Sequence, residues 1–185
     1  CILCHRCVNT CNQIVGRGAI ATLERGFQSV IGNGEGLWAD GTCESCGNCV
    51  QACPTGALTM KRRKKYRAYQ VDKKVLTTCP HCATGCQYYL LVKDGKIVDT
   101  EAYDGPSNKG LLCVKGRSGC FDFVHHPSRI TDPLIKNKET GKFEKATWDE
   151  ALDLVASKFM EIKKKYGSES LAGFACSRSP NEDIY

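Results

Sequence analysis

Residues 43–54 read CESCGNCVQACP, and this stretch decides the fold of the first third of the chain. Cys43, Cys46 and Cys49 are spaced three apart, and Cys53 follows after three more residues with a proline behind it. In two-cluster iron-sulfur proteins, three thiolates with this spacing surround one [4Fe-4S] core, and the fourth ligates the other cluster. Pro54 then ends the motif, because its ring fixes φ and it has no N–H.

The same motif occurs once more upstream, as CILCHRCVNTC in residues 1–11, with 31 residues between the two copies. This repetition indicates an internal duplication, with Asn12 standing where the usual motif has proline. Because each fourth cysteine points toward the other cluster, the ligands are expected to be exchanged between the repeats. The expected sets are Cys1, Cys4, Cys7 and Cys53 for cluster 1, and Cys43, Cys46, Cys49 and Cys11 for cluster 2.

The helices and strands around these two motifs are expected to be short. We predict a hairpin around Ile20–Val30 and a short strand over Ala57–Met60, after the turn that Thr55-Gly56 allows. A run of five basic residues, 61–65, is interpreted as a solvated linker, with contact to an acidic partner as the alternative.

A third cysteine run begins at residue 79 with CPHCATGC and is completed at Cys113. Between them, Gln87–Lys93 and Lys96–Ala102 are predicted to be antiparallel strands, because Asp94-Gly95 is a preferred two-residue hairpin turn. A hairpin therefore separates three clustered ligands from the fourth. Cys79, Cys82, Cys86 and Cys113 are expected to hold cluster 3.

Two other uses of the 14 cysteines are less consistent with the pattern. Disulfide frameworks of small secreted domains do not place cysteines in tight triplets, and a zinc site has no use for the third cysteine of each triplet.

The formal charge of +6 counts every cysteine as neutral. Three clusters would add roughly −6, at about −2 for each oxidised cubane with four thiolates, so the basic balance is weak support for nucleic-acid binding.

The remaining composition is that of an ordinary soluble globular protein, with 42% hydrophobic and 25% charged residues among 185. No apolar run approaches the roughly 18–20 residues that span a bilayer. The first residue is a proposed ligand and not methionine, so we expect the sequence to be a fragment with more chain upstream. Reduced cysteines favour a cytoplasmic location.

The last third of the sequence predicts the opening of an α/β layer. Thr147 and Glu150 form a capping box, and a helix with one apolar stripe is expected to run from there until Gly167. The stripe, which should be buried, comprises Leu152, Val155, Phe159, Ile162 and Tyr166. Ser170–Ala175 is expected to be a buried strand, followed by a loop that leads into another helix.

The third run and its surroundings resemble the small iron-sulfur domain of the molybdopterin oxidoreductases, and most closely the formate dehydrogenases. The matching stretches are Cys79–Cys86, Gly110–Arg117, Phe121–Phe123 and His126–Arg129. Residues 1–60 resemble a bacterial-type ferredoxin with two [4Fe-4S] clusters. The overall expectation is an α+β chain with a two-cluster ferredoxin-like domain (1–60), a basic linker (61–75), a [4Fe-4S] domain (76–130) and the start of a molybdopterin domain (131–185).

The resemblance implies roles for further residues. Lys115, two positions after the last cluster 3 ligand, corresponds to the lysine that lies between cluster and pterin and helps electrons to pass. Ser177, Arg178, Asn181 and Glu182 lie in the loop that approaches the pterin dinucleotide in formate dehydrogenases, although an ordinary polar loop explains them equally well. His81, His125 and His126 are expected to be structural. Cys120 and Cys176 are expected to be non-ligands.

By resemblance, the chain is the N-terminal part of a formate dehydrogenase catalytic subunit. Its three clusters would pass electrons between a molybdenum or tungsten site, held by a bis-molybdopterin guanine dinucleotide, and an NAD(P)-, ferredoxin- or hydrogenase-linked partner. The catalytic selenocysteine or cysteine and its neighbouring histidine would lie beyond Tyr185. Another molybdopterin oxidoreductase or a complex I-like subunit is one alternative, and a stand-alone electron carrier is another.

Overall fold

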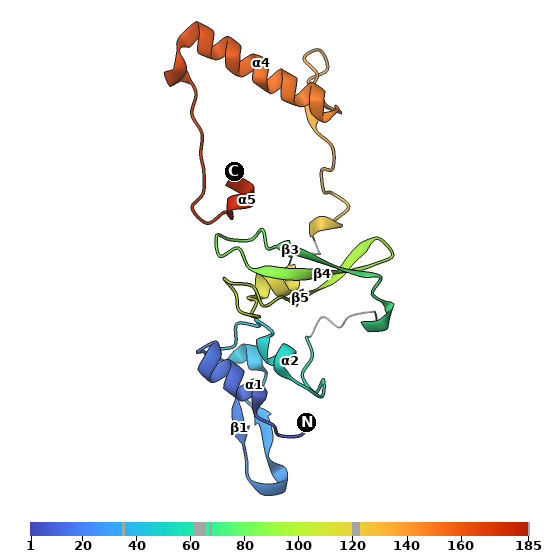
Figure 1. Cartoon of the computed structure of the whole chain (residues 1–185), viewed down its shortest axis with the longest axis vertical. Coiled ribbons are helices and arrows are strands. Elements are labelled where there is room, and N and C mark those ends of the chain that lie inside the picture. Colours follow the sequence, from blue (N-terminus) through green and yellow to red (C-terminus); the bar gives the residue numbers. More distant parts are fainter. Residues whose placement is uncertain (35, 61–65, 67, 120–122, 185) are drawn as a thin grey trace. The chain divides into compact units, whose positions relative to one another are not determined.

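The computed structural model describes residues 1–34, 36–60, 66, 68–119 and 123–184. The chain divides into two compact units, the first made of Cys1–His125 with Ser177–Tyr185 and the second of His126–Cys176. Short helices and three small antiparallel sheets in the described residues make it an α+β chain, as predicted (Figure 1). The basic run 61–65 of the predicted linker 61–75, Cys120, and residues 121–122 of the matching block lie outside the described residues.

The two cysteine loops each lead into a short helix, α1 (Arg6–Asn9) and α2 (Asn48–Ala52). Both helices start after a residue in the left-handed backbone region, His5 with φ 58° and Gly47 with φ 72°. In both loops the left-handed residue turns the chain between the second and the third cysteine.

A hydrogen bond from the backbone to the first sulfur repeats in the two loops as well. The Leu3 N–H donates to Cys1 Sγ and the Ser45 N–H donates to Cys43 Sγ, each at 3.4 Å. Leu3 and Ser45 are themselves left-handed, with φ 52° and 54°. The sequence duplication is therefore also a duplication of backbone conformation.

The repeats differ where the sequence has Asn12 in one and Pro54 in the other. In the first repeat, a π-helix, η1 (Thr10–Ile14), follows α1 directly. In the second, α2 ends and Cys53 takes an extended conformation with ψ 114°. Proline disfavours the helical conformation in the residue before it, so the second repeat turns away at the position where the first continues.

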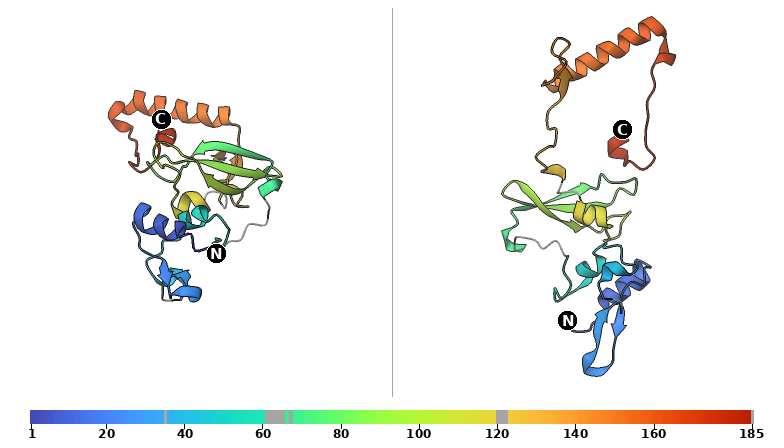
Figure 2. Two further views of the ribbon diagram at one scale, coloured as in Figure 1. Left: turned by 60° about the horizontal axis from the view of Figure 1, so that its bottom comes forward. Right: turned by 180° about the vertical axis from the view of Figure 1, so that it is seen from behind.

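The connection between the repeats contains the predicted hairpin. Strands β1 (Ala21–Leu23) and β2 (Val30–Gly32) pair antiparallel, and Figure 2 shows them as a separate two-stranded ribbon. Two 3-10 turns, η2 (Gly26–Gln28) and η3 (Trp38–Asp40), complete this segment.

The prediction of a strand over Ala57–Met60 is wrong, because this segment has no regular structure. The backbone N–H groups of Thr55, Ala57 and Leu58 are directed at the Cys53 sulfur. These donors therefore serve a proposed ligand and do not pair with a neighbouring strand.

A three-stranded antiparallel sheet in the order β3-β4-β5 forms the next part of the first unit (Figure 1). Its strands are β3 (Lys73–Thr78), β4 (Gln87–Lys93) and β5 (Lys96–Ala102), and the turn η4 (Ala68–Gln70) precedes them. The predicted hairpin is confirmed as β4–β5, with Asp94 and Gly95 at φ 51° and 71°. The strand β3 was not predicted.

The core of this part is small and lies against the third cysteine run. Cys79, Tyr88 and Leu112 are buried together, with Cys86 and Leu90 packed against them. The chain after Cys113 forms a π-helix, η5 (Lys115–Gly119). The buried hydroxyl of Thr100, on β5, donates to the carbonyls of Gly116 and Arg117 at 3.0 and 2.9 Å and so anchors η5 to the sheet.

The second unit contains the hairpin β6 (Leu134–Lys136) and β7 (Phe143–Lys145), followed by α4 (Trp148–Tyr166) and the turn η6 (Ser168–Ser170). The capping box is confirmed: Glu150 N–H donates to Thr147 Oγ1, and the Glu150 carboxylate accepts from Thr147 N–H. Gly167 ends the helix with φ 85°.

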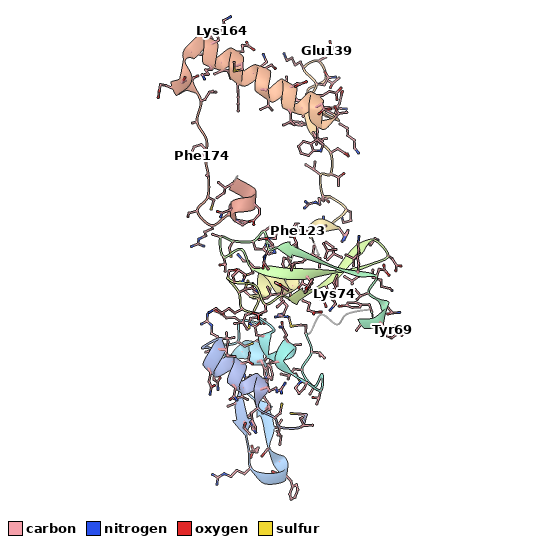
Figure 3. The ribbon with its side chains drawn as sticks, viewed as in Figure 1. Tyr69, Lys74, Phe123, Glu139, Lys164 and Phe174 are labelled. Carbon is pink, nitrogen blue, oxygen red and sulfur yellow. The ribbon has the colours of Figure 1, made fainter. Side chains whose placement is uncertain are left out.

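Two predictions for this unit are wrong. The apolar stripe of α4 is largely exposed, with Phe159 at 54%, because the described residues of the unit provide no layer against which it could pack. The segment Ser170–Ala175 forms no strand: Ser170 ends the turn η6, the following residues have no regular structure, and Phe174, labelled in Figure 3, is fully exposed. A strand needs a neighbouring edge to which it can donate hydrogen bonds. The helix predicted after the following loop is present as α5 (Asn181–Ile184).

Candidate iron-sulfur centres and their junction

The second proposed ligand set surrounds a cavity of about 360 Å³. Cys43, Cys46 and Cys49 of the second repeat line it together with Cys11 of the first. The rest of the lining is mainly apolar and comprises, among others, Val15, Ile20, Trp38, Leu58 and Val114. Four converging thiols in a mostly apolar cavity fit a [4Fe-4S] core, which needs four thiolates and some shielding from solvent.

The electrostatics of this cavity agree with that interpretation. The pKa of Cys49 is raised to about 11, first by burial and then by the neighbouring Cys46, Cys43 and Cys11, while the Val50 N–H lowers it slightly. Thiols that oppose one another's ionisation in this way are close together, and a positively charged iron core would reverse the effect by stabilising all four thiolates.

The first proposed set, Cys1, Cys4, Cys7 and Cys53, remains a prediction as a group. Cys7 is buried, whereas Cys1 and Cys4 are exposed. The pKa of Cys53 is lowered to about 6, first by the Leu58 N–H and then by the hydroxyl and N–H of Thr55. Cys53 is therefore prepared to act as a thiolate at neutral pH.

The third proposed set is assembled by a buried asparagine. Asn108 Nδ2 donates to the carbonyls of Gln87, Tyr103 and Leu111, at 3.1, 2.9 and 3.0 Å. Its Oδ1 accepts from Gln87 N–H at 3.0 Å. These bonds fasten the segment that carries Cys113 to the first residue of β4, and hence close to Cys86.

The thiols of the third set influence one another electrostatically. Burial raises the pKa of Cys86, and Cys82 and Cys113 raise it further. The pKa of Cys82 is lowered, mainly by the hydroxyl and N–H of Thr84 and in smaller part by Lys115. The Cys79 N–H donates to Cys86 O at 2.8 Å, which closes the loop. Lys115 is exposed, and its role as a relay between cluster and pterin stays a prediction.

A two-residue junction joins the second and third sets. Asn48, which precedes Cys49, donates through Nδ2 to Leu112 O at 3.0 Å and accepts at Oδ1 from Leu112 N–H at 3.2 Å. Leu112 precedes Cys113. Asn48 and Leu112 are 6% and 3% exposed, so this paired hydrogen bond is shielded from water and fixes the separation of the two sets.

Arg117 closes the junction from the side of η5. Its Nε donates to Cys46 O at 2.9 Å, and its Nη2 donates to Asn48 Oδ1 at 3.1 Å and Gln51 Oε1 at 2.6 Å. Burial lowers the pKa of Arg117, while Cys46, Cys49 and Cys113 raise it. The guanidinium stays charged, since an arginine in a protein does not lose its proton.

The remaining predicted residues are placed as follows. His125 Nε2 accepts from Ile97 N–H at 2.8 Å and His126 Nδ1 from Ser128 N–H at 3.2 Å, which supports structural roles for both. His81 packs edge-on against Phe123, with ring centroids 5.9 Å apart. The four proposed pterin contacts, Ser177, Arg178, Asn181 and Glu182, are exposed at the start of α5 and stay a prediction, as does the non-ligand role of the exposed Cys176.

In the described part of the chain, no three His, Cys, Asp or Glu side chains converge closely enough for one shared metal ion. A cubane differs from a single ion because its four thiolates bind four separate irons and so lie further apart. Among the described helices, none combines the length and the apolar character that crossing a membrane requires.

Sequence reasoning missed the junction residues Asn48, Gln51 and Arg117. One signal was available: His5 and Gly47 occupy the same position in the two repeats, and only one is glycine. A Cβ on Gly47 would lie 2.3 Å from Arg117 Cδ and 2.9 Å from Met60 Sδ. Two constraints therefore favour glycine at position 47: the close approach of Arg117, and the left-handed φ of 72°.

Three family profiles match the chain, one after another. The molybdopterin oxidoreductase Fe4S4 domain matches residues 72–126, and the molybdopterin oxidoreductase domain matches 129–185. The ferredoxin-like domain of NADH-quinone oxidoreductase subunit 3 matches 1–59. Since the two molybdopterin oxidoreductase profiles follow one another along residues 72–126 and 129–185, the chain belongs to the molybdopterin oxidoreductase family.

Relatives with several activities are similar to this chain. The NADPH-Fe(3+) oxidoreductase subunit alpha of Geobacter sulfurreducens is 36% identical over 185 residues, which is 100% of this chain and 21% of the relative. An NADH-quinone oxidoreductase subunit of Rhizobium meliloti is 35% identical over 187 residues, again covering 100% and 21%. The F420-dependent formate dehydrogenase 2 subunit alpha of Methanococcus maripaludis is 48% identical over 114 residues, 61% of this chain and 16% of the relative. The chain thus spans about a fifth of the length of these relatives.

Proposed function

We propose that the chain holds three [4Fe-4S] clusters and conducts electrons between a pterin-bound molybdenum or tungsten site and a redox partner. The observation that carries the proposal is the cavity in which Cys11 of the first repeat meets Cys43, Cys46 and Cys49 of the second. Disulfide bonds, or zinc sites formed within each repeat, would not require a cysteine of one repeat to lie beside the three cysteines of the other.

The junction supports a definite order for the three sites. Asn48 and Leu112 join the second set to the third, and Lys115 places a positive charge beside the third. The proposed route therefore runs from the pterin side past Lys115 to the third set, then through the junction to the second set, and finally to the first. Cys1 and Cys4, exposed in the first set, would face the electron-accepting partner.

Formate oxidation, or the reverse reduction of carbon dioxide, is the activity we propose for the whole protein, with a cytoplasmic location and an NAD(P)-, ferredoxin- or hydrogenase-linked partner. In support, the identity to the formate dehydrogenase subunit alpha is 48% over 114 residues. Two further relatives favour a second candidate: the subunits named NADPH-Fe(3+) oxidoreductase and NADH-quinone oxidoreductase match the chain over its full length. In that case the same clusters would carry electrons from NAD(P)H.

Two measurements test the proposal, one for the number of clusters and one for the activity of the whole protein. Iron and acid-labile sulfide in the anaerobically purified protein should amount to about twelve of each per chain. Eight irons per chain would remove one of the proposed sites, and four would remove two. Reduction of a dye by the whole enzyme with formate, compared with NADPH and NADH, distinguishes the two activities. Reduction by NADPH or NADH and none by formate would contradict the formate assignment.

A further inference from the structure

A buried positive charge lies between the second and third cysteine sets, and the family resemblance assigns it no role. Arg117 is 9% exposed, although it lies only two residues past the exposed Lys115. Burying a guanidinium is costly unless its charge and its N–H groups are compensated. The groups that compensate the charge of Arg117 therefore indicate what this residue does.

Hydrogen bonding satisfies the guanidinium without neutralising it. Its three acceptors are the Cys46 carbonyl and the amide oxygens of Asn48 and Gln51, all of them neutral. Within the described residues, no carboxylate pairs with it. The groups that favour its charge are thiols, namely Cys46 and Cys49 of the second set and Cys113 of the third.

The side chain is also held rigidly in this place. The guanidinium stem packs directly on the backbone of Gly47, since a Cβ built there would be 2.3 Å from Arg117 Cδ. Thr100 fixes the backbone of Arg117 by donating to its carbonyl at 2.9 Å. A cation with both ends fixed cannot move away when the charge beside it changes.

We infer that Arg117 is a positioning residue whose buried charge raises the reduction potentials of the clusters in the second and third sets together. Each cluster takes up one electron from the neighbouring centre, no bond is made or broken, and the added negative charge is stabilised by the guanidinium. The inference rests on the proposed function, because it requires clusters at both sets. A unit charge roughly 10 Å away, at an effective dielectric constant of about 20, changes such an equilibrium by about tenfold or more.

The test is a redox titration of the whole anaerobic protein, followed by the EPR signals of the reduced clusters. Arg117→Gln should make reduction about tenfold less favourable at two of the three clusters, which is a shift of about −59 mV for a one-electron couple. The remaining cluster is the internal standard. Arg117→Lys keeps the charge and should leave the potentials within about threefold of the original equilibrium. Arg25→Gln is the control that should leave the potentials unchanged, because Arg25 is an exposed arginine of the β1–β2 connection and is not part of the lining of the second cavity.

The outcomes separate the inference from the proposed function. A full iron content with unchanged potentials in Arg117→Gln would overturn the role of Arg117 and leave the cluster assignment intact. Equal shifts in the Gln and Lys variants would also overturn it, since geometry and not charge would then be responsible. An iron content of four or less in the original protein would overturn both. If Arg117→Gln does not load its clusters, Arg117→Lys still decides, because a tenfold shift despite the retained charge would contradict the inference.

Discussion

Replacing Asn48 with alanine should destabilise the junction between the second and third cysteine sets far more than an ordinary surface substitution. The change removes both hydrogen bonds to the Leu112 backbone, at 3.0 and 3.2 Å, and one acceptor of Arg117 at 3.1 Å. Leu112 is 3% exposed, so water cannot readily replace the lost partners of its N–H and C=O. Each buried backbone group left without a partner costs about 1–3 kcal/mol, which gives a loss of about 2–6 kcal/mol.

The loss is best measured as an unfolding rate, because cluster proteins rarely refold reversibly. We take a loss of about 3 kcal/mol and a φ value between about 0 and 0.5 for the junction, which means that at most half of its interactions are formed in the folding transition state. Unfolding in urea should then accelerate roughly 10- to 150-fold. Loss of cluster absorbance under anaerobic conditions reports this rate. Arg6→Ala is the matched control, since Arg6 has the same position in the first repeat and is exposed. An acceleration no greater than that of Arg6→Ala would refute the energetic role of the junction.

Three further predictions address other parts of the chain. Cys11→Ser should remove about four irons from the cavity formed mainly by the second repeat, whereas Cys176→Ser should keep all of the roughly twelve irons found by chemical analysis; equal losses would contradict the exchanged ligand sets. Gly47→Ala should destabilise at least twice as much as Gly56→Ala in thermal unfolding. Both glycines have positive φ, which costs alanine about 1–2 kcal/mol, but only at Gly47 does the new Cβ meet an atom at 2.3 Å. Thr147→Ala should weaken α4 by about 1 kcal/mol through loss of its cap, seen as faster amide hydrogen exchange in the first turn; unchanged exchange would contradict it.

The elements that the sequence predicted correctly are specified by a few adjacent residues. The β4–β5 hairpin depends on the left-handed pair Asp94-Gly95, and α4 begins at a capping box whose two hydrogen bonds both connect Thr147 with Glu150. The cysteine spacing also predicted that Cys11 lies near the Cys43–Cys49 triplet, and the four cysteines line one cavity; their role as cluster ligands stays a prediction. In each case the interaction that determines the structure is local or repeats a known motif.

The wrong predictions concern segments whose conformation depends on distant partners. Ala57–Met60 was expected to form a strand after the Thr55-Gly56 turn, but the N–H groups of Ala57 and Leu58 are directed at the Cys53 sulfur. Ser170–Ala175 and the apolar stripe of α4 would need a neighbouring layer that the described residues do not supply. The junction escaped prediction because Asn48 and Leu112 are 64 positions apart, and no local pattern marks the partners of a buried amide.

The exchange of a ligand between repeats has a consequence for how the protein is made. Cys11 leaves the ribosome well before Cys43, yet both line the same cavity. A cluster held by these four cysteines, as proposed above, could not be completed during synthesis until residue 49 has emerged, and Cys11 would have to stay reduced until then. Its insertion would wait for most of the ferredoxin-like segment, and any oxidant present in that interval would act on an unfinished site.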